Sequence, residues 1–136
     1  MRMLIEGVNP PVRKTTGSCG YDISCPQDIQ ILYNEWLSID LGILMEPGDI
    51  PEGYCALIVP RSSSKVILRN VVGVIDSDYT MDTIKARIKS IDCNLPRFIA
   101  KNDRILQMII VPFAVIPNEE PPREKRTGGI GSTGVA

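Results

Sequence analysis

The stretch Ile84-Lys85-Ala86-Arg87-Ile88-Lys89 alternates apolar and basic side chains with a period of two. In a β-strand this period places the apolar residues on one face of a sheet and the basic residues on the other. Ile84, Ile88 and Ile91 also fit a helical spacing, but β-branched isoleucine favours the strand. The stretch therefore predicts a strand with one buried and one polar face.

Other segments of strand length lie on both sides of this stretch. Residues 54–59, 71–75 and 105–111 are continuous apolar runs, which are typical of strands covered on both faces, and residues 38–43 alternate. Eleven prolines and eleven glycines leave few stretches long enough for an average helix. The sequence predicts an all-β fold, a compact barrel or jelly-roll-like sandwich with at most one short helix.

Length and composition limit the function. The 136 residues suit one domain, and 15 Lys and Arg against 16 Asp and Glu give a net charge of -1, which provides no basic surface for nucleic acid. The chain has no histidine, which excludes Ser-His-Asp and Cys-His catalysis and imidazole metal sites. A general base must therefore be Asp, Glu, Lys, Cys or Tyr, and we expect a small-molecule partner rather than nucleic acid or membrane.

The four cysteines indicate the compartment. Cys19, Cys25, Cys55 and Cys93 form no CxxC pair, and no signal or membrane-spanning segment is recognisable. We expect reduced thiols in a cytoplasmic or nuclear protein.

Two internal segments carry groups suited to chemistry. Pro60-Arg61-Ser62-Ser63-Ser64-Lys65 follows an apolar run and could bind phosphate, or be an ordinary polar loop or a helix cap. Gly73-Val74-Ile75-Asp76-Ser77-Asp78-Tyr79 places a carboxylate at a strand end. A tight hairpin there would present backbone donors and acceptors to a planar ligand, whereas the common alternative is a β-turn with local hydrogen bonds.

The apolar pattern stops at Asn118, so we expect a single domain over residues 1–117 and a mobile arm over 118–136. The arm ends in Gly128-Gly129-Ile130-Gly131-Ser132-Thr133-Gly134 before its last two residues. Such composition is common in disordered termini. Alternatively, the glycines allow backbone N–H groups to converge on an anion, with Ser132 and Thr133 adding hydroxyl donors.

Five segments, in order along the chain, resemble the five motifs of the all-β dUTP diphosphatase (dUTPase) family. The resemblance extends from position 20 to position 134 and implies a β-clip type fold. It also implies a homotrimer in which each site combines several subunits and the arm of one subunit closes over the site of its neighbours. The implied reaction is hydrolysis of dUTP to dUMP and pyrophosphate by attack of water on the α-phosphorus, with Mg²⁺ on the triphosphate. The segments are Gly20-Tyr21-Asp22-Ile23, Pro60-Arg61-Ser62-Ser63, residues 70–79, Arg104-Ile105-Leu106-Gln107-Met108 and Gly128 to Gly134.

The resemblance assigns the nucleoside end of the site. Asp76 would be the general base, and Tyr79 would lie against the deoxyribose and leave no room for a 2′-hydroxyl. Asn70 and the backbone around Gly73 would pair with the uracil edge. Ile130 stands where the family usually has a stacking aromatic, which predicts a weaker closed state.

It also assigns the phosphate end. Arg61, Ser62 and Ser63 would bind the α- and β-phosphates, and Asp22 and Gln107 would hold magnesium through waters only. The γ-phosphate would be received in the arm by Ser132 and Thr133 with Gly129 and Gly131, and by either Lys125 or Arg126.

Departures from the family pattern leave other functions open. Thr80-Met81 replaces the usual Arg-Gly pair after Tyr79, and one extra residue precedes the next strand. A dCTP deaminase or bifunctional deaminase and diphosphatase of the same fold would need a further catalytic Glu, for which Glu52 is the upstream candidate. A catalytically weakened regulatory module that binds nucleotide is another alternative, and a structural domain with chance motifs is a third.

Overall fold

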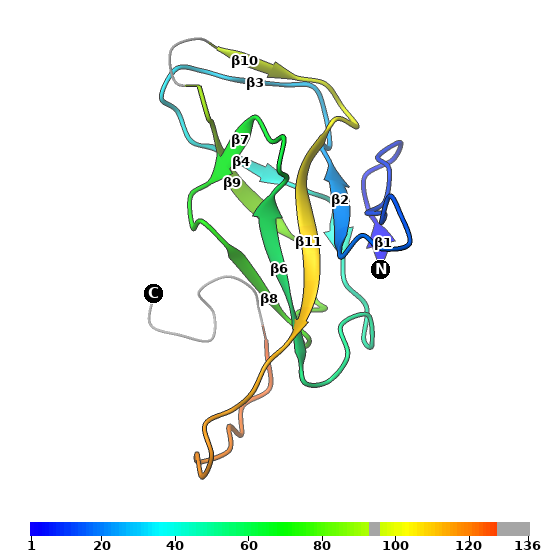
Figure 1. The fold of residues 1–136 in the computed structure, drawn as a ribbon, viewed down its shortest axis with the longest axis vertical. Helices are drawn as coiled ribbons and strands as arrows, with labels where there is room; N and C mark the ends of the chain where they lie inside the picture. Colours follow the sequence, from blue (N-terminus) through cyan, green and yellow to red (C-terminus); the bar gives the residue numbers. More distant parts are fainter. Residues whose placement is uncertain (93–95, 128–136) are drawn as a thin grey trace.

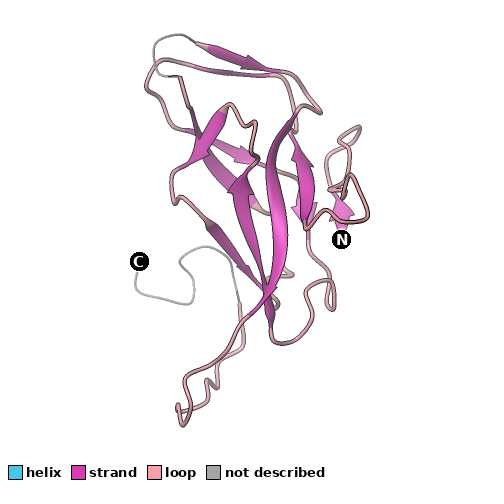
Figure 2. Cartoon of the chain, viewed as in Figure 1, coloured by secondary structure: helices cyan, strands magenta, loops and turns pink. Residues whose placement is uncertain are grey.

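The structure is a computed structural model that describes residues 1–92 and 96–127 (Figure 1). The regular structure in these residues is β-strand, and Figure 2 shows strands joined by loops, with no helix in the described part. The all-β prediction is confirmed. None of the described residues forms a helix able to cross a membrane. The strands are β1 (Arg2–Met3), β2 (Gly20–Ser24), β3 (Ile29–Ile31), β4 (Leu37–Asp40), β5 (Ile43–Leu44), β6 (Tyr54–Pro60), β7 (Val66–Leu68), β8 (Gly73–Asp76), β9 (Lys85–Ser90), β10 (Arg97–Ile99) and β11 (Arg104–Pro112).

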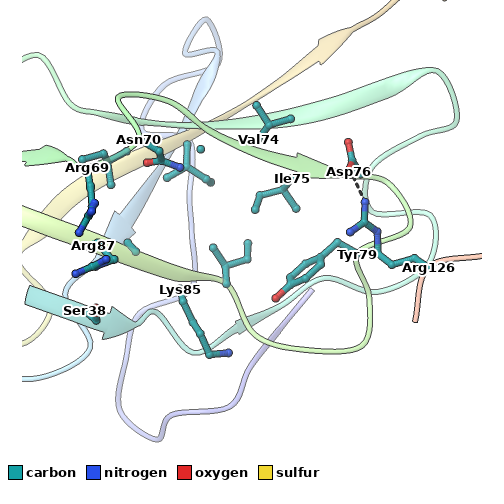
Figure 3. Close-up of a pocket in the computed structure, with 15 residues that line it drawn as sticks. Ser38, Arg69, Asn70, Val74, Ile75, Asp76, Tyr79, Lys85, Arg87 and Arg126 are labelled. Carbon is teal, nitrogen blue, oxygen red and sulfur yellow. Dashed lines mark hydrogen bonds and ion pairs between the residues drawn. The ribbon is translucent and has the colours of Figure 1, made fainter. Parts of the chain in front are cut away.

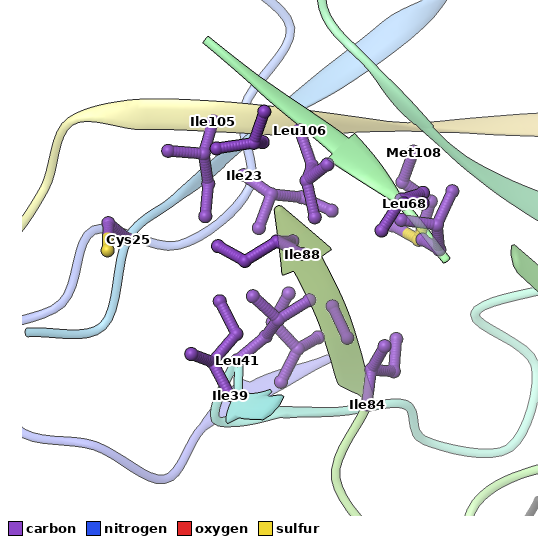
Figure 4. Packing of buried hydrophobic residues seen from close by; sticks show 14 of the residues in the cluster. Ile23, Cys25, Ile39, Leu41, Leu68, Ile84, Ile88, Ile105, Leu106 and Met108 are labelled. Atoms are coloured by element: carbon purple, nitrogen blue, oxygen red, sulfur yellow. The ribbon is translucent and has the colours of Figure 1, made fainter. Parts of the chain in front are cut away.

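Two antiparallel sheets contribute most of the core. The larger has the strand order β2-β11-β6-β8, and the smaller has the order β4-β9-β7. Two-stranded pairs, β1 with β5 and β10 with β3, complete the described strands. Both larger sheets contribute to one apolar cluster, in which Ile23 and Leu106 of the first sheet and Ile88 of the second are at most 1% exposed (Figure 4).

The alternating stretch forms β9 as predicted. Ala86 and Ile88 are buried, whereas Lys85 and Arg87 are exposed on the other face. The alternating window 38–43 is divided into β4 and β5 at Gly42, which has a positive φ of 72°. A Cβ at Gly42 would lie 2.7 Å from the side chain of Ile5, so this bend depends on glycine.

The barrel alternative is wrong. The described strands form open sheets, with β2 and β8 at the edges of the larger sheet and β4 and β7 at the edges of the smaller. The sheets share one core without a continuous ladder between them. The sandwich alternative therefore describes the chain better.

The hairpin alternative around Asp76 is also wrong. β8 pairs with β6, whereas the next strand, β9, pairs with β4 and β7. The strands on either side of Tyr79 thus belong to different sheets, and the outer edge of β8 has no strand partner among the described residues. Nor is β8 covered on both faces, because Val74 is 59% exposed.

Residues 69–72 connect β7 of one sheet to β8 of the other. Val71 has a φ of 65°, an unusual conformation for a β-branched residue, and its N–H donates to the Leu68 carbonyl at 3.1 Å. This turn brings Asn70 back beside Gly73, where an added Cβ would lie 3.7 Å from Asn70 Nδ2. The connection therefore places a side-chain amide beside the free edge of β8.

Candidate active site

A pocket of about 730 Å³ lies between β8 and the smaller sheet (Figure 3). Its lining includes the apolar side chains of Ile58, Ile75 and Ile84, and Asn70 lies at its wall. Because β8 is an edge strand, its backbone groups on this side are available to a ligand. An apolar pocket with polar backbone groups along one wall suits a flat heterocycle.

Asp76 lies at one end of the pocket, at the last position of β8. Its side chain is 56% exposed, and Arg126 Nη2 donates to Asp76 Oδ2 at 2.5 Å (Figure 3). Arg126 Nε also donates to Asp78 Oδ1 at 2.7 Å, and the guanidinium carbon lies 5.9 Å from the centre of the Tyr79 ring. The chain after β11 therefore returns to the pocket and places a cation on the predicted base.

Tyr79 is 6% exposed and forms part of the pocket wall. Its hydroxyl donates to the Thr83 carbonyl at 3.0 Å, which fixes the ring after the turn from Asp76. Burial raises the pKa of Tyr79, so the hydroxyl remains a donor at neutral pH. The ring thus presents a rigid surface next to the carboxylate.

A second polar cluster lies at the opposite end of β6. Arg61 Nε donates to Asp22 Oδ1 at 3.1 Å, and Arg61 Nη1 donates to the Arg104 carbonyl at 3.1 Å. The Asp22 side chain is 13% exposed and is also 3.7 Å from Arg104 Nη1. Arg61 Nη2 has no hydrogen bond to any described residue, so this part of the fork can bind an anion.

Gln107 and the serine loop belong to this second cluster. Gln107 Nε2 donates to the Pro60 carbonyl at 3.3 Å, and a Cβ at Gly20 would overlap the Gln107 carboxamide oxygen. A smaller pocket of about 270 Å³ includes Arg61 and Ser63, and Ser62 is exposed beside it. The second cluster therefore combines an arginine, serine hydroxyls and a carboxamide.

The strand register separates the two clusters. Asp76 pairs with Cys55 of β6, and Pro60, which precedes Arg61, lies five residues further along the same strand. At 3.4 Å per residue this is a separation of about 17 Å. One chain therefore gathers Asp76, Asn70, Gly73 and Tyr79 at one place, and Asp22, Arg61, Ser62, Ser63 and Gln107 at another.

Two of the predicted arm residues, Lys125 and Arg126, lie in the part of the chain that the structure describes. Arg126 has a 12% exposed side chain in the contacts given above, whereas Lys125 is exposed. The predicted positions Gly129, Ile130, Gly131, Ser132 and Thr133 lie outside the described residues, as does Cys93.

Some pocket residues were absent from the sequence prediction. Asp78 was not assigned a contact, although its place two residues after Asp76 allows one cation to reach both. Arg69 and Arg87 were not assigned to the site, although one precedes Asn70 and the other lies on the polar face of the alternating stretch. These two features of the sequence could have identified Arg69 and Arg87 as pocket residues.

The described residues include no group of three or more His, Cys, Asp or Glu side chains that could hold a metal ion. Asp22 is engaged by Arg61 and Arg104, and Asp76 by Arg126. This donor set does not suit a metal held by protein groups alone. It does suit a magnesium ion that keeps its waters and is carried by a phosphate ligand.

A family model described as dUTPase matches residues 7–134. The chain belongs to the dUTPase family. Two relatives named deoxyuridine 5′-triphosphate nucleotidohydrolase match along nearly their full length. That of Hydrogenobaculum sp. is 35% identical, and that of Paramecium bursaria Chlorella virus 1 is 31% identical, each with 99% of this chain and 96% of the relative covered.

This dUTPase-family chain also matches a segment of longer viral proteins. It is 36% identical to the Gag-Pro polyprotein of mouse mammary tumor virus over 89% of the chain, but the match spans only 14% of that polyprotein and 7% of the Gag-Pro-Pol form. The relatives thus include both short proteins and polyprotein segments.

Solved dUTPases share the fold. The Streptococcus mutans dUTPase has a TM-score of 0.69 and 25% identity, covering 85% of this chain and 97% of that one. The Staphylococcus bacteriophage 80alpha dUTPase with dUPNHPP has a TM-score of 0.71 and 21% identity, covering 98% and 96%. The strand arrangement described above is therefore the family arrangement.

Proposed function

We propose that this chain hydrolyses dUTP to dUMP and pyrophosphate by attack of water on the α-phosphorus. The observation that carries the proposal is the pocket along the free edge of β8, which ends at the exposed carboxylate of Asp76 beside Tyr79. Asp76 orients the water and accepts its proton, since the chain has no histidine for this role. Family membership supports the same reaction.

The pocket walls account for the choice of nucleoside. The free backbone edge at Gly73 and the Asn70 side chain pair with uracil, and a cytosine amino group would meet a donor instead of an acceptor. Such unpaired polar groups discriminate more strongly than apolar shape. Tyr79, fixed by its bond to the Thr83 carbonyl, packs on the deoxyribose and excludes a 2′-hydroxyl.

The phosphate cluster serves a neighbouring subunit in this proposal. The α-phosphorus must lie close to Asp76, but the Arg61 cluster of the same chain is about 17 Å away along β6. A homotrimer supplies Arg61, Ser62 and Ser63 from another copy, where they neutralise charge in the transition state.

Asp22 and Gln107 would hold magnesium on the triphosphate through its waters rather than directly, which fits the ion pairs that already engage Asp22. The ion would supply charge neutralisation at the phosphate oxygens.

The arm over residues 118–136 closes the site. Arg126 leaves Asp76 when substrate enters and binds the γ-phosphate, with Lys125 as a second cation. Ile130 covers the uracil by apolar contact, and Ser132 and Thr133 with Gly129 and Gly131 receive the γ-phosphate. Closure of this kind excludes water from the reacting groups.

The deciding experiment is a pyrophosphate-release assay with dUTP, dTTP, dCTP and UTP, with and without magnesium. We expect turnover of dUTP alone, dependent on magnesium, with a turnover number of about 1–10³ per second. Ammonia release from dCTP would instead indicate a deaminase, for which Glu52, exposed in the turn before β6, would have to act. Saturable dUTP binding without pyrophosphate release would indicate a regulatory module.

A further inference from the structure

The end of the pocket opposite Asp76 is lined by Arg69, Arg87 and Ser38 (Figure 3). Arg69 N–H donates to the Arg87 carbonyl at 3.0 Å, and Arg87 pairs with Ser38 across β9 and β4. Residues directly opposite in antiparallel strands share a face of the sheet. The two guanidinium groups and the hydroxyl therefore come from one row across the smaller sheet.

This row carries a local positive charge that the protein does not neutralise. Arg69 and Arg87 are exposed, and neither side chain makes a hydrogen bond or an ion pair with any described residue. The other cations of the pocket are paired, Lys85 with Asp82 at 3.1 Å and Arg126 with Asp76. Like charges directly opposite in a sheet are destabilising, so the pairing of Arg69 with Arg87 does not stabilise the fold.

We propose that Arg69, Arg87 and Ser38 form an anion subsite for a phosphoryl or carboxylate group at the base end of the nucleotide pocket. Two guanidinium forks and a hydroxyl provide donors matched to such oxyanions. This proposal rests on the proposed function only in placing the nucleoside in this pocket. Since β8 spans about 10 Å from Gly73 to Asp76, an anion at the arginines does not overlap a triphosphate that leaves the pocket past Asp76.

The source of this anion is a free oxyanion such as pyrophosphate, which the proposed reaction releases.

Trp36, the single tryptophan, is a built-in reporter for this subsite. Lys89 Nζ lies 5.5 Å from the centre of the Trp36 ring. Lys89 lies two residues from Arg87 in β9, and Trp36 lies two residues before Ser38. This is about 7 Å along the strands, so binding at the arginines changes the surroundings of the indole.

The test titrates pyrophosphate and dUMP into the full chain, with Trp36 fluorescence and calorimetry as readouts. We expect Arg69→Gln/Arg87→Gln to weaken pyrophosphate binding about tenfold or more. The control Arg2→Gln/Lys14→Gln removes the same charge at exposed positions away from the pocket and should leave binding within about twofold. Its melting temperature and that of the test variant should remain near the wild-type value.

The outcomes can support or overturn the proposal. Arginine-dependent pyrophosphate binding that persists with dUMP present supports a subsite separate from the nucleotide. If the arginine variant matches the control for every probe, or if only Arg61→Gln weakens pyrophosphate binding, the subsite does not exist. These experiments measure binding, so they test the anion subsite independently of whether the chain hydrolyses dUTP.

Discussion

The two ends of β6 carry polar clusters that differ in how their charges are held. At one end, Asp76 is 56% exposed and its recorded partner is Arg126 from the chain's own terminal segment. At the other end, Asp22 is 13% exposed and holds Arg61, whose second bond goes to a backbone carbonyl. The first cluster can change partners, whereas the second is preorganised. We infer that the first cluster serves the nucleoside and the attacking water, and that the second stabilises charge on the phosphates in the transition state.

The largest effect is expected from Asp76→Asn, which removes the base but keeps the shape of the side chain. Turnover of dUTP should fall about 10²- to 10⁴-fold, while nucleotide affinity stays close to that of the wild-type chain. Steady-state kinetics and calorimetry with dUMP measure both quantities. Asp28→Asn is a control outside both clusters. Undiminished turnover in Asp76→Asn would remove Asp76 from the mechanism.

The separation of the clusters predicts complementation between inactive variants. Arg61→Gln should lower dUTP turnover about 10²-fold, because one transition-state donor is lost. If subunits exchange after mixing Asp76→Asn with Arg61→Gln in equal amounts, about a quarter of composite sites regain both groups in a symmetric oligomer. The measurement is activity before and after subunit exchange. A mixture no more active than its components would place each complete site within one chain.

A smaller effect is expected at Gly20, which lies under Gln107 in the phosphate cluster. Gly20→Ala would displace the Gln107 carboxamide, a flexible group, so the free energy of unfolding should change by only about 1 kcal/mol. Turnover should fall roughly tenfold or less because the bond to the Pro60 carbonyl is disturbed. Gly48→Ala is a poor control because of its positive φ, so Gly17→Ala, which meets nothing within 4 Å, is preferred. Equal activity of both variants would argue against a role for Gln107.

The smallest effect concerns Tyr79 and pH. Burial raises its pKa in the folded chain, so the folded state keeps the phenol proton where the unfolded chain, with a pKa near 10, begins to lose it. The stability this contributes is fully present below about pH 10 and is lost as pH rises through the raised folded value. Tyr79→Phe should cost about 1 kcal/mol at neutral pH and flatten this alkaline decline. Melting curves test it, with the exposed Tyr33→Phe as the control; identical alkaline slopes for all three proteins would contradict it.

The sequence predicted the strands wherever the side-chain period was clear. The stretch 84–89 became β9, and the apolar runs 54–59 and 105–111 became β6 and β11, each within one residue at either end. The window 71–75 was less accurate, because Val71 adopts a left-handed conformation and only Gly73–Asp76 form β8. Local periodicity does not report such a turn, since tertiary contacts impose it.

The pairing of strands and the tail contact could not be predicted in the same way. Adjacent strands usually pair, so residues 70–79 indicated a hairpin, whereas β8 pairs with β6 and leaves a pocket facing β9. Arg126 contacts Asp76 although the two residues are 50 positions apart in the sequence. Local patterns in the sequence cannot predict a contact at this separation. The family motifs predicted the site residues, and the fold showed which of the described ones lie together.

The free edge of β8 has a consequence for handling the protein. An edge strand that has no strand partner on this side among the described residues, next to an exposed Val74, is also a template on which another chain can add a strand. Ligand and aggregation then compete for the same groups. Storage with dUMP should therefore keep concentrated solutions clear for longer than storage without it.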